Sequence, residues 1–250
     1  MLICESTRRQ IREMKLNDMI DIVERQESMT EFMSMPFIER LDFVIQALYE
    51  SKQQEKIVRL RHRARLKFPN ANINAIYYQD RGLDRNQILN LTSGAFLGEH
   101  NCVLFKGPTG SGKTFLACAM ANAAAISRGI RALYVRLPDL AQIISNRSVE
   151  RKKLLRKYSV PSVLIIDEWL TNEINKDAME FMLDLMDLRN ESSSTIFCSL
   201  YPSSEWPARL GNCVLGESIL DRIVHGMETV FCGNLNMREV QKRGSLRELH

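Results

Sequence analysis

The stretch Gly107-Pro108-Thr109-Gly110-Ser111-Gly112-Lys113-Thr114 decides the fold of this chain of 250 residues. It matches the pattern G-x-x-x-x-G-K-S/T at every fixed position and directly follows the apolar run 102–105. Glycines let backbone N–H groups close around phosphate oxygens, and the helix expected from Gly112 directs its positive dipole end toward them. We expect Lys113 to reach the β- and γ-phosphates of ATP, and Thr114 to hold Mg²⁺ through its hydroxyl. The predicted nucleotide-binding segment also includes the adjoining Phe115.

A second apolar run, 163–166, ends in the acids Asp167 and Glu168. In a parallel sheet buried on both faces, strand ends meet at the carboxyl edge, where the phosphate-binding loop also opens. We therefore expect Asp167 in the magnesium shell with Thr114, and Glu168 to orient or deprotonate a water that attacks the γ-phosphate. An acidic pair after a strand is also a common turn signal. Paired with the loop at 107–114, it favours hydrolysis over transfer to a small molecule.

The chain around these motifs alternates short β-branched or aliphatic runs with helical stretches. This alternation predicts an α/β fold in which crossover helices connect a five-stranded parallel sheet. The predicted strands are 102–105, 132–136, 162–166, 195–199 and 229–232. The predicted helices lie near 113–128, 138–157 (broken), 175–190 and 217–226.

The residues before this domain follow a helical pattern. Apolar residues from Ile11 to Val23 recur at helical spacing, which predicts one amphipathic helix that ends near Ser28. Ser34 and Pro36 suit the start of a second, long helix. Its end is strongly basic, and the stretch 68–72 that follows is unfavourable to a helix. We predict an all-α N-terminal domain at 1–68 and a nucleotide-binding domain at 69–250.

The composition is that of a globular protein, with 45% apolar and 26% charged residues. No apolar run approaches the roughly 18 residues that a membrane span needs. The six cysteines never stand two residues apart and suit buried, reduced thiols. These features predict a cytoplasmic protein with no membrane partner.

Taken in order, GPTGSGKT, LIIDEW, STIFCSLYPSSEW and SILDRIVHG resemble the IstB family of insertion-sequence transposition helpers. These are AAA+ P-loop ATPases similar to the DnaC-type helicase loaders. The stretch 81–85 and the basic helix before it also resemble IstB proteins, so the resemblance covers nearly the whole chain. The two Walker motifs are common to all AAA+ proteins, whereas the segments 195–206 and 218–226 are more specific.

The resemblance implies that the nucleotide lies between neighbouring subunits and that an arginine of the next protomer completes the site. Arg222 stands at the matching position. A guanidinium suits this role because it spreads positive charge over the equatorial phosphate oxygens. Arg222 therefore joins Lys113 and Glu168 as a predicted catalytic residue. The alternative is a surface pair of Asp221 with Arg222.

Two further positions depart from the family pattern. The fourth strand of such proteins usually ends in a polar side chain directed at the γ-phosphate, but here Ser199 is followed by Leu200. Either Ser199 or Cys198 takes this role, or turnover is weak. Arg238 fits the C-terminal arginine motif of the family with a small shift in register. We expect it to contact the nucleotide; a simple surface charge is the alternative.

Basic side chains cluster in the segments 52–67 and 147–157, each with a single acid. Neither segment carries aromatic residues spaced for base stacking or a base-reading motif, which favours sequence-tolerant contact with phosphates. A solvated charged face is the alternative. The net charge of one chain is a modest +4. In a polymer, however, the basic segments of successive protomers would form a continuous basic surface. The predicted DNA contacts are Lys56, Arg59, Arg63, Lys67, Arg147, Arg151, Lys152 and Lys153.

The sequence thus predicts an ATPase dependent on ATP and Mg²⁺ that assembles on double-stranded DNA as a homo-oligomer, in a filament or a ring. By resemblance it recruits or stimulates the transposase of the same element. A helicase loader and an ATP-gated DNA scaffold with little hydrolysis are the alternatives. A metabolic kinase would need an acceptor pocket and a lid, for which the sequence has no signal.

Overall fold

The structure is a computed structural model that describes residues 3–146 and 150–240. The chain forms two compact units, one up to Arg59 and one from Leu60 onward. The border between them lies inside the long helix α4 (Phe37–Ala64). The functional division of the chain at 68–69 is not tested by this packing and stays a prediction.

The N-terminal unit is helical, with α1 (Glu5–Glu13), α2 (Asn17–Ser28), α3 (Thr30–Met33) and most of α4. The long helix after Pro36 is confirmed, whereas the single helix expected from Ile11 to Ser28 is wrong. The chain breaks at Lys15, whose φ of 58° is left-handed. The N–H of Leu16 donates to the carbonyl of Ile11 at 3.0 Å, which closes a Schellman turn. Side-chain periodicity does not reveal such a backbone turn.

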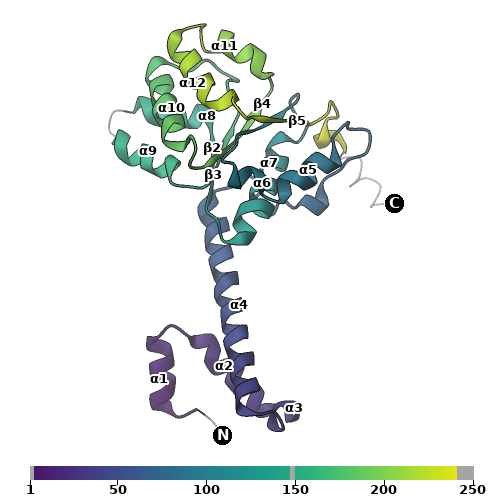
Figure 1. The fold of residues 1–250 in the computed structure, drawn as a ribbon, viewed down its shortest axis with the longest axis vertical. Helices are drawn as coiled ribbons and strands as arrows, with labels where there is room; N and C mark the ends of the chain where they lie inside the picture. The colour runs from purple at the N-terminus through teal and green to yellow at the C-terminus, as the bar shows by residue number, and fades with distance from the viewer. Residues whose placement is uncertain (1–2, 147–149, 241–250) are drawn as a thin grey trace. The chain divides into compact units, whose positions relative to one another are not determined.

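The second unit carries the parallel sheet and the helices between its strands (Figure 1). Before the sheet come η1 (Ile73–Ala75), α5 (Arg85–Thr92) and α6 (Ala95–Gly98). The strands are β1 (Val103–Lys106), β2 (Ala132–Arg136), β3 (Val163–Asp167), β4 (Ser194–Ser199) and β5 (Glu228–Phe231). The helices between them are α7 (Lys113–Met120), η2 (Ala121–Ala125), η3 (Ile126–Arg128), α8 (Leu137–Ser145), α9 (Arg151–Ser159), α10 (Lys176–Arg189), η4 (Ser203–Glu205), α11 (Trp206–Arg209) and α12 (Val214–Val224).

All five strands are parallel, in the order β2-β3-β4-β1-β5. The α/β class, the sheet and the break between α8 and α9 are confirmed. The helix expected over 113–128 changes to a π-helical turn at Ala121 and then to a 3-10 turn. A run of small alanines at this point lets the helix widen without losing its burial.

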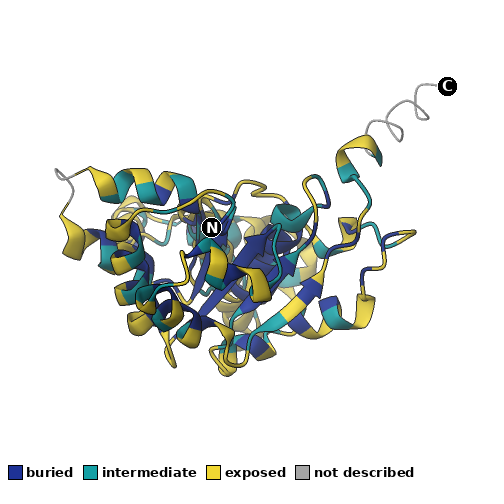
Figure 2. Ribbon diagram, turned by 90° about the horizontal axis from the view of Figure 1, so that it is seen from above, coloured by how far each residue is buried: buried dark blue, intermediate teal, exposed yellow. Residues whose placement is uncertain are grey.

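Alternate residues of the strands build two apolar faces, and the strands at the centre of the sheet are buried (Figure 2). One face, including Leu104, Leu164 and Phe197, packs in a single cluster with apolar side chains of α8, α9, α10 and α12. Helix α7 packs on the sheet, where it contacts β1, β3 and β4. Because both faces are covered, polar side chains can leave the sheet only where its strands begin or end, at the amino and carboxyl edges.

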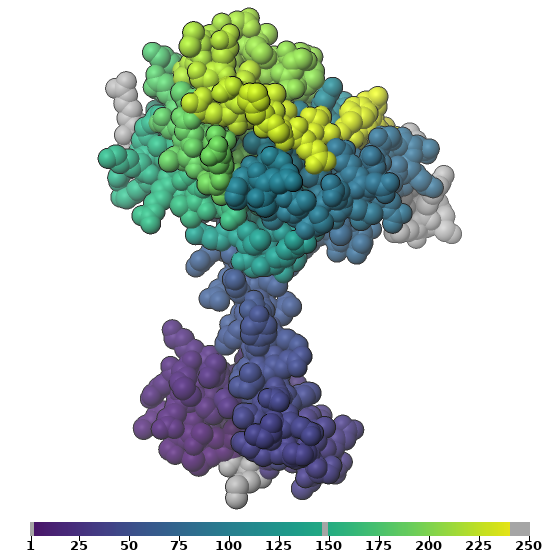
Figure 3. Space-filling model, viewed as in Figure 1, coloured from purple at the N-terminus to yellow at the C-terminus, as the bar shows by residue number. Residues whose placement is uncertain are grey.

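The end of β5 brings the C-terminal segment back to the phosphate-binding loop. The N–H of Cys232 donates to the carbonyl of Lys106 at 2.7 Å, and that of Met237 donates to the carbonyl of Gly110 at 2.9 Å. In the space-filling view (Figure 3), the yellow residues after β5 lie against the blue residues that precede β1. In the part of the chain that the structure describes, no helix is long and apolar enough to cross a membrane.

Gly233 marks the tightest contact of this C-terminal segment. Its φ is 75°, and a Cβ added there would lie 1.8 Å from the carbonyl oxygen of Arg81. We expect Gly233→Ala to lower the unfolding free energy by about 2–5 kcal/mol, since a left-handed backbone and a main-chain clash add together. Gly211, with a φ of 76° and open space around it, is the control. Gly211→Ala should cost only about 1–2 kcal/mol in the same urea titration, and equal losses would contradict the proposed clash.

Candidate nucleotide-binding site

The phosphate-binding loop lies between β1 and α7 and is built on glycine geometry. Gly110 and Gly112 both have a φ of 85°, and a Cβ on Gly110 would lie 2.4 Å from Oδ1 of Asn236. The hydroxyl of Ser111 is buried inside the loop with no hydrogen-bond partner among the described residues. A loop with left-handed glycines and a buried, unpaired hydroxyl fits phosphate oxygens.

Lys113 begins α7 and folds over the loop. Its Nζ donates to the carbonyls of Gly107 at 2.7 Å and Pro108 at 2.8 Å. Burial lowers the pKa of Lys113 from its ordinary value. The only positive charge of the loop is therefore held directly beside the backbone that cradles phosphate.

Asp167, at the end of β3, is 2% exposed and accepts a hydrogen bond from each of three groups. Thr114 Oγ1 donates at 2.9 Å, the hydroxyl of Tyr134 at 2.8 Å, and the N–H of Glu168 at 2.9 Å. A carboxylate beside a threonine hydroxyl is an oxygen donor set that fits Mg²⁺. Thr114 and Asp167, the predicted metal ligands, therefore lie together.

Tyr134 is a residue of this site that the sequence analysis missed. It lies on β2 opposite Ile165 of β3, so the register of the sheet brings its ring to the acidic end of β3. Burial, followed by the charge of Asp167, raises the pKa of Tyr134 far above its ordinary value. Its hydroxyl therefore stays a donor that fixes the carboxylate. A tyrosine in an apolar strand carries no sequence signal for this role.

Glu168 follows Asp167 with a left-handed φ of 57°. Arg136, at the end of β2, binds both of its carboxylate oxygens: Nε donates to Oε1 at 3.0 Å and Nη2 to Oε2 at 2.7 Å. Hydrogen bonds from Arg136 lower the pKa of Glu168 below its ordinary range. The carboxylate is thus kept ionised, as a general base requires, but both oxygens are engaged.

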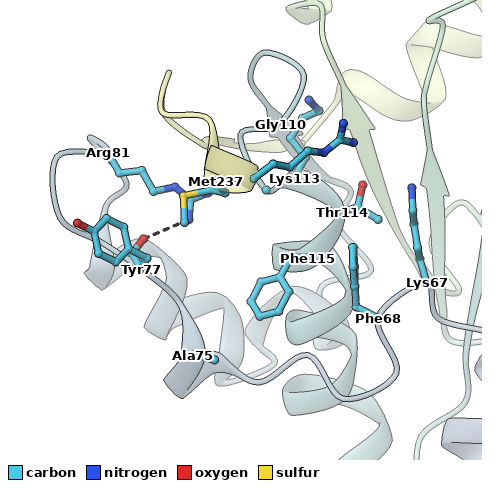
Figure 4. A pocket seen from close by; sticks show the side chains of 12 residues that line it. Lys67, Phe68, Ala75, Tyr77, Arg81, Gly110, Lys113, Thr114, Phe115 and Met237 are labelled. Carbon is cyan, nitrogen blue, oxygen red and sulfur yellow. Dashed lines mark hydrogen bonds between the residues drawn. The ribbon is translucent and has the colours of Figure 1, made fainter. Parts of the chain in front are cut away.

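A pocket of about 190 Å³ opens beside the loop. Phe115 of α7 faces Phe68, with ring centroids 5.9 Å apart, and Tyr77 and Met237 close the pocket (Figure 4). An apolar wall next to the phosphate-binding loop suits a flat nucleobase. The remaining side chains include Lys67 and Arg238. Arg238, predicted to contact the nucleotide, thus lines this pocket, and so does Lys67, which was predicted to contact DNA.

Arg81 ties this pocket together, a role that the sequence analysis did not assign. It is 4% exposed, and its guanidinium donates to the carbonyls of Cys232 at 3.0 Å, Tyr77 at 3.1 Å and Ser111. Burial lowers the pKa of Arg81. One buried cation thus connects the linker before α5, the phosphate-binding loop and the end of β5.

Two other predicted residues lie outside the pocket. Ser199 is fully buried, and its hydroxyl donates to the carbonyl of Trp169 at 3.0 Å and accepts from the N–H of Tyr201 at 3.1 Å. Arg222, on α12, forms an ion pair with Asp187 of α10 and donates to the carbonyl of Ser218 at 2.7 Å. Neither side chain lines the pocket of its own chain.

The predicted DNA contacts divide into paired and unpaired cations. Arg151 pairs with Asp184 at 2.7 Å and Lys153 with Glu150 at 2.8 Å. The exposed side chains that form no ion pair with any described carboxylate are Lys56, Arg59, Arg63, Lys67 and Lys152. Arg147 lies outside the described residues.

The strand order, the loop after β1 and the acidic pair at the end of β3 define a P-loop nucleotide-binding fold. The fold matches the crystal structure of the DnaC helicase loader with a TM-score of 0.55, over 65% of this chain and 96% of that one, at 22% identity. Residues 9–245 match the profile of the IstB-like ATP-binding proteins, and the chain belongs to this family.

Two relatives are named as ATP-binding proteins of insertion sequences. The relative from Sinorhizobium fredii is 33% identical over 190 residues, which are 73% of this chain and 77% of that protein. The relative from the insertion sequence IS1162 of Pseudomonas fluorescens is 31% identical over 206 residues, which are 81% of this chain and 89% of that protein. The resemblance seen in the sequence motifs is therefore confirmed.

The ion pair of Arg136 with Glu168 predicts that the basal ATPase rate is restrained. Because the pair is partly exposed, it stabilises this arrangement by about 1 kcal/mol at most. We expect Arg136→Ala to raise DNA-independent phosphate release by up to about fivefold, the rate equivalent of that energy. Arg128→Ala, at an exposed arginine that forms no ion pair with a described residue, should leave the rate unchanged. A lower rate in Arg136→Ala would show that Arg136 assists the reaction.

Proposed function

We propose that this chain is an ATP-dependent, DNA-binding ATPase that assembles as an oligomer on target DNA and recruits or stimulates the transposase of its insertion sequence. One observation carries the proposal: Lys113 and Thr114 line the pocket and Thr114 binds Asp167, which Glu168 follows, whereas Arg222 lies on a different surface of the same chain. The insertion-sequence names of the relatives support the transposition context. We place the protein in the bacterial cytoplasm, on the nucleoid when bound to DNA.

Each residue of the site has a separate task in hydrolysis. The backbone of the loop and Lys113 bind the phosphates, and Thr114 and Asp167 hold Mg²⁺, which neutralises charge on the β- and γ-phosphate oxygens. Glu168 orients the attacking water and accepts its proton once Arg136 releases its oxygens. Phe68 and Phe115 together form the apolar wall against which the base packs, and Arg238 approaches the phosphates from the C-terminal segment.

Lys113 is the only positive charge of the phosphate-binding loop. We expect a neighbouring subunit to supply a second one at the nucleotide. The pocket of about 190 Å³ is smaller than the roughly 300–1,000 Å³ of enclosed small-molecule sites, which suits a nucleotide covered by a second protein surface. Arg222 is 29% exposed on α12, so its guanidinium is available to a neighbour after it leaves Asp187. ATP would then stabilise the contact between subunits, and hydrolysis would release it.

A nucleotide-gated scaffold with little hydrolysis is the second candidate. It is favoured by Ser199, whose hydroxyl is engaged by the backbone of Trp169 and Tyr201, and by the engaged oxygens of Glu168. Steady-state phosphate release with and without duplex DNA separates the two candidates, with Glu168→Gln as the control without hydrolysis. Tight ATP binding without any release above that control would favour the scaffold. Recovery of a replicative helicase in place of the transposase in a pull-down would favour a loader.

The location of Arg222 predicts a specific result for mixed oligomers. Glu168→Gln and Arg222→Ala should each abolish ATP hydrolysis in the presence of DNA. In a random equal mixture, about a quarter of the head-to-tail interfaces join an intact Glu168 to an intact Arg222. We therefore expect the mixture to recover roughly that share of wild-type phosphate release. If Arg222 acted on the nucleotide of its own chain, mixing would restore nothing.

A further inference from the structure

A basic groove of about 470 Å³ lies at the amino edge of the sheet, away from the nucleotide pocket. It is formed by the end of α4, the start of β2 and the end of α9, three segments of the second unit. Leu60, Ala132, Leu133 and Pro161 are its apolar lining residues. The others are His62, Arg63, Arg65, Arg131 and Lys157, and none of the described residues that line the groove is acidic. We call this surface the basic groove.

The cations of the basic groove are free to bind an anion. Arg63, Arg65, Arg131 and Lys157 are exposed, and none of them forms an ion pair with a described carboxylate. Other cations on the surface do form such pairs, as in Arg8 with Glu24, Arg151 with Asp184 and Arg222 with Asp187. Burying a phosphate beside unpaired cations breaks no existing ion pair, so its attraction is not offset by such a loss.

Two of these cations belong to residues that are anchored by buried neighbours. Arg65 has a left-handed φ of 52°, between the fully buried Ala64 and Leu66, which is 6% exposed. The ammonium of Lys157 lies 4.8 Å from the ring centroid of the buried Tyr158. The positive charges are therefore displayed from anchored residues and not from a freely moving tail.

The chemistry of the basic groove matches a run of phosphodiesters better than a single phosphate. Four cations from three separate segments converge on it, and duplex DNA presents one negative charge per roughly 1.7 Å of its axis. None of the described lining residues is Phe, Tyr or Trp, so the basic groove lacks the large rings on which successive unpaired bases stack. These features favour the backbone of double-stranded DNA, without sequence preference.

We propose that the basic groove binds the phosphate backbone of duplex DNA through Arg63, Arg65, Arg131 and Lys157. This rests on the proposed function, and it moves the DNA contact away from Arg151 and Lys153, which are already paired. The basic groove is also adjacent in sequence to the nucleotide pocket. Arg65 lines the first, Lys67 and Phe68 line the second, and only the buried Leu66 separates them.

The test compares two triple variants of the full chain with equal loss of charge. The groove variant is Arg63→Gln, Arg131→Gln and Lys157→Gln. The control variant is Arg9→Gln, Lys153→Gln and Lys176→Gln, three exposed cations that each pair with a glutamate. Binding to short fluorescent duplexes of unrelated sequence is measured by anisotropy with a non-hydrolysable ATP analogue, between about 50 and 200 mM salt.

We expect the groove variant to bind every duplex about tenfold or more weakly, and its slope of log affinity against log salt to fall by about 3, near one per phosphate contact. The control variant should keep the wild-type affinity and slope. Nucleotide affinity and thermal unfolding of the groove variant should match those of the wild type, which shows that it folds. DNA stimulation of phosphate release should be lost, with the basal rate unchanged.

Three results would overturn this inference. A groove variant with wild-type affinity and slope would reject the basic groove while leaving the proposed function intact. Wild-type protein that binds no duplex would reject the proposed function and the basic groove together. Inorganic phosphate that displaces the duplex from the wild type at constant ionic strength, but not from the groove variant, would show a site for a free anion instead.

Discussion

A buried carboxylate organises this protein. Asp167 is 2% exposed, and an ionised group at that depth is stable only when hydrogen bonds replace its water. The three donors come from α7, β2 and the turn after β3. Strand pairing, the start of the helix after the phosphate-binding loop, and the geometry around Asp167 therefore depend on one another. The fold and the oxygens proposed to hold Mg²⁺ form together.

The sequence was sufficient for the features that depend on runs of like residues. Strands buried on both faces appear as continuous apolar runs, and the loop at 107–114 has a fixed spacing, so the sheet and the center of the site could be predicted. Features set by single backbone turns or by tertiary pairing could not. The break at Lys15, the hydrogen bond from Tyr134 and the buried guanidinium of Arg81 all involve residue types that are ordinary in their local sequence.

The charged side chains show most clearly what could not be predicted from the sequence alone. Counting cations along the chain gives equal weight to Arg151 and to Arg131, but only the first has a carboxylate partner, and that partner is on a different helix. Arg131 stands alone before β2 and belongs to no basic cluster in the sequence. Its importance arises because the fold brings it beside Arg63 and Lys157. The charge available to a ligand is thus a property of the folded surface.

The segment from Arg65 to Phe68 connects the two surfaces that the function requires. Only the buried Leu66 separates Arg65 of the basic groove from Lys67 of the nucleotide pocket, and we infer that this anchored segment couples the two surfaces. Any such coupling is reciprocal: DNA in the basic groove changes the affinity for ATP by the same factor by which ATP changes the affinity for DNA. In the function proposed above, DNA is held while ATP is bound, and a short anchored segment between the two surfaces is a direct way to supply this coupling.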